Sequence, residues 1–342
     1  MEVALFDYEL PPELVAKEPA PERDSSRLLV LDRKTGAVQH RIFKDIAGLL
    51  GKGDLLVLND TKVFPARVHG YRRTGATAEV LFLRQREDKT WEALIGTRGH
   101  PQVKETFVLL GGRLRVTVLE KTVTGTYFLK ADPEDVPGLL EQYGEVPLPP
   151  YIDRKKPDAE QREFDIKRYQ TVYARNIGSA AAPTAGFHFT EKTLSDLTAH
   201  GVAIAYLTLH ISYETFRPVK ETTVEEHRMY SEFYRVPPET LSAISTARSS
   251  GGRVIAVGTT SCRVLETLAR GAPPEGSTDI FIYPPFQFLS TDALITNFHL
   301  PKSTLLMLVC AFAGRELILK TYQEAIQQRY RFYSYGDAMF IT

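Results

Sequence analysis

The feature that most constrains the fold is a long run of strand-like segments without a helical pattern. Between residues 63 and 130 the chain alternates apolar and polar residues in short runs such as AEVLFLRQ and RLRVTVLEK, separated by glycines and polar turns. Strands at this spacing predict a small antiparallel barrel or sandwich. The segment GEVPLPPYIDRKKP, residues 144–157, contains four prolines and indicates a boundary after this module.

The second half of the chain has a different pattern, in which strands alternate with helices. VAIAYLTLHI, RVIAV and TDIFIYPPF predict strands, and a helix is expected between an N-cap at Thr190 and Gly201. Alternating strands and helices predict a mixed or largely parallel sheet with helices on its faces. We therefore predict a multi-domain α/β protein. Its large mixed-sheet body comprises residues 1–62 and 151–342, and residues 63–150 form a smaller antiparallel β-barrel domain inserted into it.

Composition limits the classes of function that the chain can serve. The 342 residues include 42 Lys and Arg and 42 Asp and Glu, so any surface that binds a polyanion has to be local. Two cysteines are too few for a disulfide framework, and no histidines stand at metal-ligand spacing with a carboxylate, so no metal is expected. The N-terminus lacks a signal-peptide pattern, and STLLMLVCAFAG is too short to cross a bilayer. We expect a cytoplasmic protein that does not associate with membranes.

Two loops that follow predicted strands carry polar groups suited to a ligand. Residues 258–261, Gly-Thr-Thr-Ser, open a helix whose free N–H groups suit an anion or a polar group. Asn297 and His299 end another strand, and open α/β sheets hold ligands at the carboxyl ends of their strands. Taken singly, the first loop is also explained by an ordinary helix cap, and the second by a loop histidine whose hydrogen bonds are made within the protein. No glycine-rich dinucleotide motif or Walker-type lysine is present.

Two further segments combine backbone freedom with polar or aromatic side chains. In GSAAAPTAGFHFT, residues 178–190, small residues permit close approach to a ligand, Gly186 is able to adopt a positive φ, and His188 follows. In the C-terminal RYRFYSYGDAMFIT, Tyr333 and Tyr335 are able to stack on a base and Asp337 to accept from an amine, with core packing as the alternative for the aromatics.

One basic stretch, residues 152–175, interleaves lysines and arginines with aromatic residues. This combination suits phosphate contact and base stacking, although five acidic residues also favour a solvated charged loop. The residues expected to contact RNA are Arg154, Lys155, Lys156, Lys167 and Arg168.

Seven segments, taken in order, resemble one known family. GDLLVLNDTKVFPARV, GEVPLPPYI, RYQTVYA, AAPTAGFHFT, VGTTSCRVLE, LITNFHLPKSTLLMLVCAFAG and YRFYSYGDAMFI are similar to the S-adenosylmethionine:tRNA ribosyltransferase-isomerases of queuosine biosynthesis. The resemblance implies that S-adenosylmethionine donates its ribosyl group to 7-aminomethyl-7-deazaguanine at the wobble position of a tRNA. Adenine and methionine leave, and the rearranged sugar becomes that of epoxyqueuosine. It also implies a mixed α/β body with an inserted barrel and no metal.

The resemblance assigns roles to the candidate residues. His188 and His299 are the expected general base and acid, because an unperturbed imidazole pKa suits both tasks. Asp337 would steer the amine of the substrate. The expected substrate-binding residues are Asp60, Thr61, Arg67, Pro183, Thr184, Gly186, Gly258, Thr259, Thr260, Ser261, Asn297 and Tyr335.

Three motifs depart from the usual family pattern. HISYETFRPV at 210–219 stands where the family has HVGAGTFRPV, MYSE at 229–232 replaces MHSE, and YPPF replaces YPGY. Ser212 and Glu214 thus occupy glycine positions, and Tyr230 a histidine position. Two alternatives follow: a divergent paralogue that binds S-adenosylmethionine or a related nucleoside with a different acceptor, and a non-catalytic tRNA-binding protein. A monomer is expected.

Overall fold

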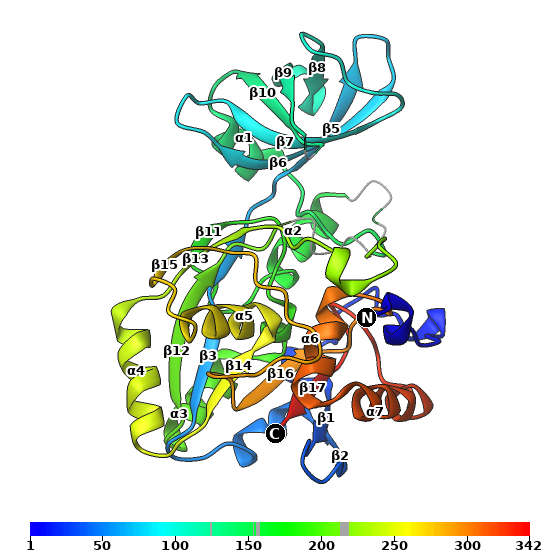
Figure 1. Cartoon of the computed structure of the whole chain (residues 1–342). Coiled ribbons are helices and arrows are strands. Elements are labelled where there is room, and N and C mark those ends of the chain that lie inside the picture. Colours follow the sequence, from blue (N-terminus) through cyan, green and yellow to red (C-terminus); the bar gives the residue numbers. More distant parts are fainter. Residues whose placement is uncertain (124, 153, 155–157, 213–218) are drawn as a thin grey trace.

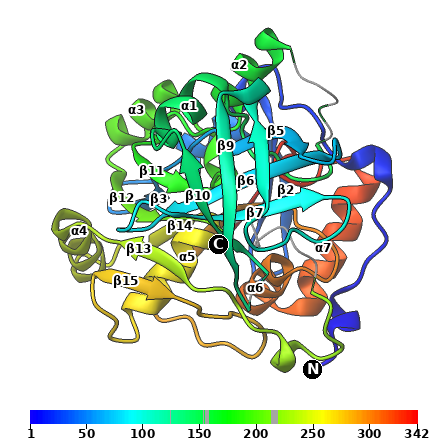
Figure 2. The same ribbon diagram turned by 90° about the horizontal axis from the view of Figure 1, so that it is seen from above.

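The chain folds into a large α/β body with a separate β-barrel standing on top of it (Figure 1). This architecture is seen in a computed structural model, which describes the whole chain except residues 124, 153, 155–157 and 213–218. Figure 2 shows the barrel from above, with α4 (Pro238–Ser249) on one side of the body and α6 (Thr304–Ala313) and α7 (Arg315–Gln327) on the other.

The body is built around a mixed sheet whose central strands are parallel. Its strands are β1 (Arg27–Leu31), β2 (Val38–Ile42), β3 (Leu55–Asn59), β12 (Ala203–Leu209), β13 (Glu232–Arg235), β14 (Val254–Val257), β15 (Glu275–Thr278), β16 (Ala293–Asn297) and β17 (Ala338–Ile341). Their order is β15-β13-β12-β3-β14-β16-β17-β1-β2, and β12, β3, β14 and β16 run parallel. The C-terminal strand β17 pairs with β1 and β16, so the two ends of the chain complete one sheet.

The central strand β3 shows why this sheet requires cover on both faces. All five of its residues are buried, because side chains alternate between two hydrophobic clusters. Leu55 and Val57 pack on one side with residues of α5 (Gly258–Leu268) and α6, whereas Leu56 and Leu58 pack on the other side near α3 (Glu191–Ala199). The predicted α/β body is therefore confirmed.

Two helix ends lie where the capping and glycine signals in the sequence predict them, whereas one predicted strand does not form. The Thr190 hydroxyl accepts a hydrogen bond from the N–H of Thr193 and caps α3, and Gly314, with φ +92°, separates α6 from α7. The predicted strand TDIFIYPPF is wrong: β15 ends at Thr278, where that run begins. Consecutive prolines at 284 and 285 offer no N–H for a strand ladder, which accounts for the irregular segment there.

The second module is a closed antiparallel barrel, as predicted. Its strands are β5 (Arg67–Arg72), β6 (Thr77–Gln85), β7 (Trp91–Thr97), β8 (Thr106–Leu109), β9 (Leu114–Lys121) and β10 (Tyr127–Asp132), in the order β10-β7-β6-β5-β8-β9. Strands β5 and β8 approach so closely at Gly70 that a Cβ there would lie 2.1 Å from the Val108 carbonyl oxygen. The short helix α1 (Val136–Tyr143), which the strand pattern did not predict, adds Val136 and Leu140 to the barrel core.

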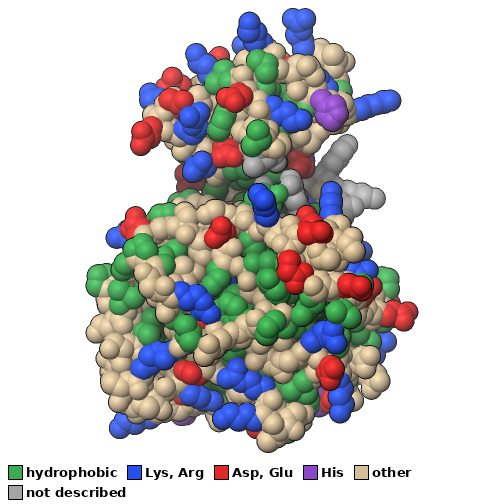
Figure 3. Space-filling model, in the orientation of Figure 1, with side chains coloured by type: hydrophobic (Ala, Val, Ile, Leu, Met, Phe, Trp, Pro, Cys, Tyr) green, Lys and Arg blue, Asp and Glu red, His purple; other side chains and the backbone are tan. Residues whose placement is uncertain are grey.

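A small sheet connects the barrel to the body. Strand β4 (Thr61–Val63) leads from β3 toward the barrel and pairs in parallel with β11 (Asn176–Ser179), which follows α2 (Ala159–Arg168). The predicted domain limits, at 62/63 and 150/151, fall close to this connection and remain predictions. Figure 3 shows the resulting waist between barrel and body, and hydrophobic side chains that gather below it over α5 and α6.

Candidate functional site

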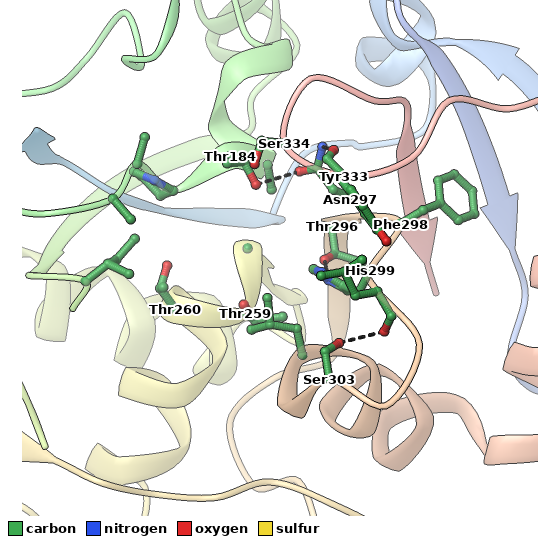
Figure 4. A pocket seen from close by; sticks show the side chains of 18 of the residues that line it. Thr184, Thr259, Thr260, Thr296, Asn297, Phe298, His299, Ser303, Tyr333 and Ser334 are labelled. Atoms are coloured by element: carbon green, nitrogen blue, oxygen red, sulfur yellow. Dashed lines mark hydrogen bonds between the residues drawn. The ribbon is translucent and has the colours of Figure 1, made fainter. Parts of the chain in front are cut away.

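A cavity of about 100 Å³ lies at the carboxyl ends of β14 and β16, where the sheet was expected to hold a ligand. Most of its wall comes from four parts of the chain: residues 181–185, 258–260, 296–301 and 333–334. Figure 4 shows Thr259 and Thr260 of α5 facing the segment 296–299 across this space. We call it the first cavity.

Seven of the predicted substrate-binding and catalytic residues line the first cavity. They are Pro183, Thr184, Gly258, Thr259, Thr260, Asn297 and His299. The sequence loops identified by strand position thus meet in one place, although they are far apart in the chain.

Tyr151 also lines the first cavity, although the sequence reasoning did not include it among the substrate-binding residues. Its hydroxyl accepts a hydrogen bond of 2.8 Å from the N–H of Ser334, and its ring packs against Tyr333 at 4.9 Å between centroids. Tyr333 adopts φ +74°, an uncommon conformation for a bulky residue that is enriched at functional sites. The position of Tyr151 in the Pro-rich boundary segment concealed its place in the cavity wall.

A hydrogen-bonded chain of side chains leads from the first cavity to His188. The Thr184 hydroxyl donates to the side-chain oxygen Oδ1 of Asn297 at 3.1 Å, and the side-chain nitrogen Nδ2 of Asn297 lies 3.3 Å from Nε2 of His188. On its other side, Nδ1 of His188 lies 2.7 Å from the hydroxyl of Ser26. Burial, with smaller contributions from the charges of Arg331 and Arg23, lowers the pKa of His188 to about 3. His188 is therefore a neutral imidazole at pH 7, placed behind the cavity wall.

His299 belongs to the wall itself. Its Nε2 lies 2.7 Å from the Thr296 hydroxyl, its N–H donates to the Tyr322 hydroxyl oxygen at 3.1 Å, and its carbonyl oxygen accepts from the Tyr8 hydroxyl. Burial lowers the pKa of His299 to about 3. The unperturbed pKa assumed from the sequence is therefore wrong for both histidines, because neither ring is solvated.

Asp337 and Tyr335 are buried outside the wall of the first cavity. The two carboxylate oxygens of Asp337 accept hydrogen bonds from the N–H groups of Arg27, at 2.9 Å, and Arg331, at 2.7 Å. Burial raises the pKa of Asp337. Tyr335 packs edge-on against Tyr169 and borders a smaller cavity of about 20 Å³ that also includes His188. Asp337 thus ties β1 to the C-terminal segment, and its predicted role with the substrate amine remains a prediction.

Asp60 and Thr61 follow β3 and form a polar cluster near the connection to the barrel. Both Asp60 carboxylate oxygens accept from the Asn176 amide at 3.0 Å, and one accepts from the Thr208 hydroxyl at 2.7 Å. The Thr61 hydroxyl lies 2.8 Å from Nδ1 of His210. These groups connect β3, β11 and β12, and they do not line the first cavity.

Three other predicted residues also lie outside the wall of the first cavity. Arg67 belongs to the barrel and donates to the Leu148 carbonyl oxygen at 3.2 Å, and Ser261 is fully buried within α5. The prediction of a positive φ at Gly186 is wrong, because Gly186 is not among the glycines with positive φ. A Cβ there would lie 2.0 Å from the Tyr173 hydroxyl, so packing against that tyrosine requires the glycine.

The basic stretch is used in part to hold the N-terminal segment. Arg154 forms ion pairs with Glu18 and Asp165, and Arg168 donates to two backbone carbonyl oxygens of residues 20 and 21. Lys167 is exposed. Three residues named in the sequence analysis lie outside the described residues: Lys155, Lys156 and Glu214.

The fold and the first cavity define a class: a mixed α/β protein with an inserted barrel and a cavity at the carboxyl ends of its central strands. Comparisons with known proteins identify the family. A profile described as queuosine biosynthesis protein matches residues 3–341. The chain is 49% identical to the S-adenosylmethionine:tRNA ribosyltransferase-isomerase of Thermotoga maritima and 50% identical to that of Acetivibrio thermocellus, each over all of both chains.

A solved structure agrees with these relatives. The crystal structure of S-adenosylmethionine tRNA ribosyltransferase from Thermotoga maritima matches with a TM-score of 0.56 and 40% identity, covering 99% of this chain and 100% of that chain. This chain belongs to the queuosine biosynthesis protein family. In the part of the chain that the structure describes, no group of three or more His, Cys, Asp or Glu residues is arranged to hold a metal ion. No described helix combines the length and apolar character needed to span a membrane.

Proposed function

We propose that this protein transfers the ribosyl group of S-adenosylmethionine to 7-aminomethyl-7-deazaguanine in a tRNA and isomerises it, with release of adenine and methionine, to give epoxyqueuosine. The observation that carries the proposal is the composition of the first cavity. Residues 181–185, 258–260, 296–301 and 333–334 meet there, and these are parts of the segments that resemble the family. We further propose that the enzyme acts as a cytoplasmic monomer.

The first cavity offers groups suited to a nucleoside. Ala181, Ala182 and Ala185 leave room beside the backbone, and Thr259 and Thr260 present hydroxyls in the first turn of α5. Hydroxyl groups and free N–H groups at a helix start bind sugar hydroxyls without adding charge. An uncharged wall suits a donor that is itself cationic, because a fixed positive charge there would repel the sulfonium.

The low pKa of His299 determines which role we propose for this residue in the reaction. Nε2 is engaged by Thr296, which leaves Nδ1 for the substrate. A neutral buried imidazole donates or accepts a hydrogen bond without changing charge at pH 7. We therefore assign His299 to hold a proton at the leaving adenine or at the sugar. His188, which is linked to the cavity through Asn297, keeps that amide oriented.

The tRNA substrate would approach from the barrel side of the body. Tyr151 lies at the end of the segment that returns from the barrel, and it forms part of the cavity wall. Of the predicted tRNA contacts, Lys167 is exposed on α2 and has its charge available to phosphate, whereas Arg154 and Arg168 already bind protein groups.

Mass spectrometry of tRNA after incubation with protein and S-adenosylmethionine tests the function. The expected result is a ribosyl-derived adduct on the modified guanine, together with released adenine. His299→Ala should lower the rate roughly 100-fold or more, within the range for loss of one hydrogen-bonding group positioned at the reacting atoms. The matched control is His200→Ala, because His200 is exposed at the end of α3. Adenine release without an adduct on the tRNA would favour a paralogue with another acceptor, and tRNA binding without adenine release would favour a non-catalytic protein.

A further inference from the structure

A second cavity, of about 280 Å³, adjoins the first. The two cavities share Thr259, Thr260 and Leu305 in their walls, so α5 and the start of α6 separate them only in part. The second cavity extends toward β13 and the irregular segment 280–282. One elongated ligand is therefore able to reach from one space into the other past the two threonines.

The wall of the second cavity contains a buried ion pair. Arg263, 5% exposed, donates through Nη1 to Glu232, 3% exposed. Its Nε donates to the Ile280 carbonyl oxygen at 3.2 Å, and Nη2 to the Thr278 carbonyl oxygen at 3.3 Å. Glu232 also accepts from the N–H of Ser212 at 2.7 Å. These contacts hold the guanidinium in place and use three of its five N–H donors, leaving two.

The first and second cavities thus present different chemistry to a ligand. The first is lined by small, hydroxyl and neutral groups, whereas the second has several charged side chains in its wall, among them Lys220, Glu221 and the Arg263–Glu232 pair. A fixed pair of opposite charges complements a zwitterion, because Arg263 is able to bind a carboxylate and Glu232 an ammonium. Ile282, Leu305 and Leu308 add apolar surface suited to a methylene chain.

We infer that the second cavity binds the α-amino-acid head of S-adenosylmethionine, through Arg263 and Glu232. The inference rests on the proposed function for the identity of the donor, and it adds where the amino-acid part lies and which residues recognise it. The nucleoside then occupies the first cavity, and Thr259 and Thr260 lie beside the single bond between the ribose C5′ and the sulfur. Methionine leaves from the second cavity and adenine from the first.

Calorimetric titration with two ligands tests this inference. S-Adenosylmethionine contains the amino-acid head, whereas 5′-methylthioadenosine keeps the nucleoside and sulfur but lacks that head. The protein should bind S-adenosylmethionine at least about tenfold more tightly than 5′-methylthioadenosine, since hydrogen bonds to charged groups are each worth that much. In the double variant Arg263→Met/Glu232→Gln this preference should disappear, with the affinity for 5′-methylthioadenosine unchanged. Both charges are removed together because breaking a buried pair by removing one member destabilises more than replacing both.

The chain offers a matched control. Arg253 and Asp54 also form an arginine–carboxylate ion pair, more exposed than the first, with a distance of 2.6 Å between Nη2 and Oδ2, at the other end of β14 and β3. The variant Arg253→Gln/Asp54→Asn should keep both affinities. Should the first double variant not fold, Met229→Trp replaces it: Met229 is half-buried in the wall of the second cavity, and the larger ring should weaken only S-adenosylmethionine, by about tenfold.

Two results would overturn the inference: equal binding of both ligands by the unaltered protein, or a preference that survives both the double variant and Met229→Trp. Its failure is separable from failure of the proposed function. If the enzyme forms the tRNA adduct but its preference for S-adenosylmethionine over 5′-methylthioadenosine does not depend on Arg263 and Glu232, the inference alone is contradicted. If binding of S-adenosylmethionine depends on its amino-acid head but no tRNA adduct forms, the proposed function alone is contradicted.

Discussion

The first and second cavities lie side by side, yet they are built in different ways. The first is formed by backbone turns, small residues and His299, whose pKa is depressed by burial. The second is formed around charged side chains that are held by long-range contacts. Its wall also includes Ser212 and Tyr230, two of the positions that depart from the usual family pattern. Recognition of a nucleoside by shape and recognition of a charged head by an ion pair are thus assigned to separate parts of one site.

The largest expected effect is on the ion pair of the second cavity. The single variant Arg263→Met removes the guanidinium from the buried Arg263–Glu232 ion pair, and should lower the free energy of unfolding by about 3–5 kcal/mol. The double variant Arg263→Met/Glu232→Gln should recover most of that loss. Urea unfolding of the two variants measures the difference. Equal stability of the single and double variants would show that the pair is not isolated from solvent.

The neutral His299 in the wall of the first cavity and the neutral His188 behind it predict a dependence of stability on pH. Burial lowers the pKa of both His188 and His299 from 6.5 to about 3, so between these values the unfolded chain binds protons that the folded chain does not. Stability is then complete above pH 6.5 and falls on acidification, by about 1.4 kcal/mol per pH unit for each histidine. Urea unfolding at pH 7.5 and 5.5 should differ by roughly 3 kcal/mol from this pair. His299→Gln should remove about half of that difference, and an unchanged pH dependence in this variant would contradict the assigned pKa.

The smallest expected effect is at the rim of the second cavity. Tyr230 is 38% exposed there, and Tyr230→His restores the residue that the family usually has. Because the ion pair in the wall supplies the main recognition, the affinity for S-adenosylmethionine should change by roughly threefold or less. Calorimetric titration measures it. A loss larger than that of the Arg263→Met/Glu232→Gln variant would place recognition at the rim instead.

The fold was largely predictable because its signals are local. Strand runs with polar turns predicted the barrel, and alternation of strands with helices predicted the body. Helix α1 was missed because Pro137 and Gly138 interrupt its apolar pattern, although Asp135 caps it and proline is favoured in the first turn. The strand expected over residues 278–286 failed because Pro284 and Pro285 have no N–H for a strand ladder, while the preceding residues 280–282 line the second cavity.

The two cavities differed in how far the sequence predicted them. The first was found because ligand sites follow the carboxyl ends of parallel strands, a rule that depends only on strand order. The second was not, since Glu232 and Arg263 lie on β13 and α5 and are brought together only by tertiary packing. Charged residues are mostly exposed in proteins, so no local pattern marks a buried pair. The same lack of solvent altered the pKa values of His188 and His299, which the sequence could not show.

A crystal structure with bound S-adenosylmethionine would decide whether one ligand spans the two cavities. The adenine and ribose are expected between residues 181–185 and 296–299, with the carboxylate about 2.7–3.2 Å from the guanidinium of Arg263. The ammonium is expected at the same distance from Glu232. A ligand whose amino-acid head points away from the Arg263–Glu232 pair, or whose adenine occupies the second cavity, would contradict this division of the site.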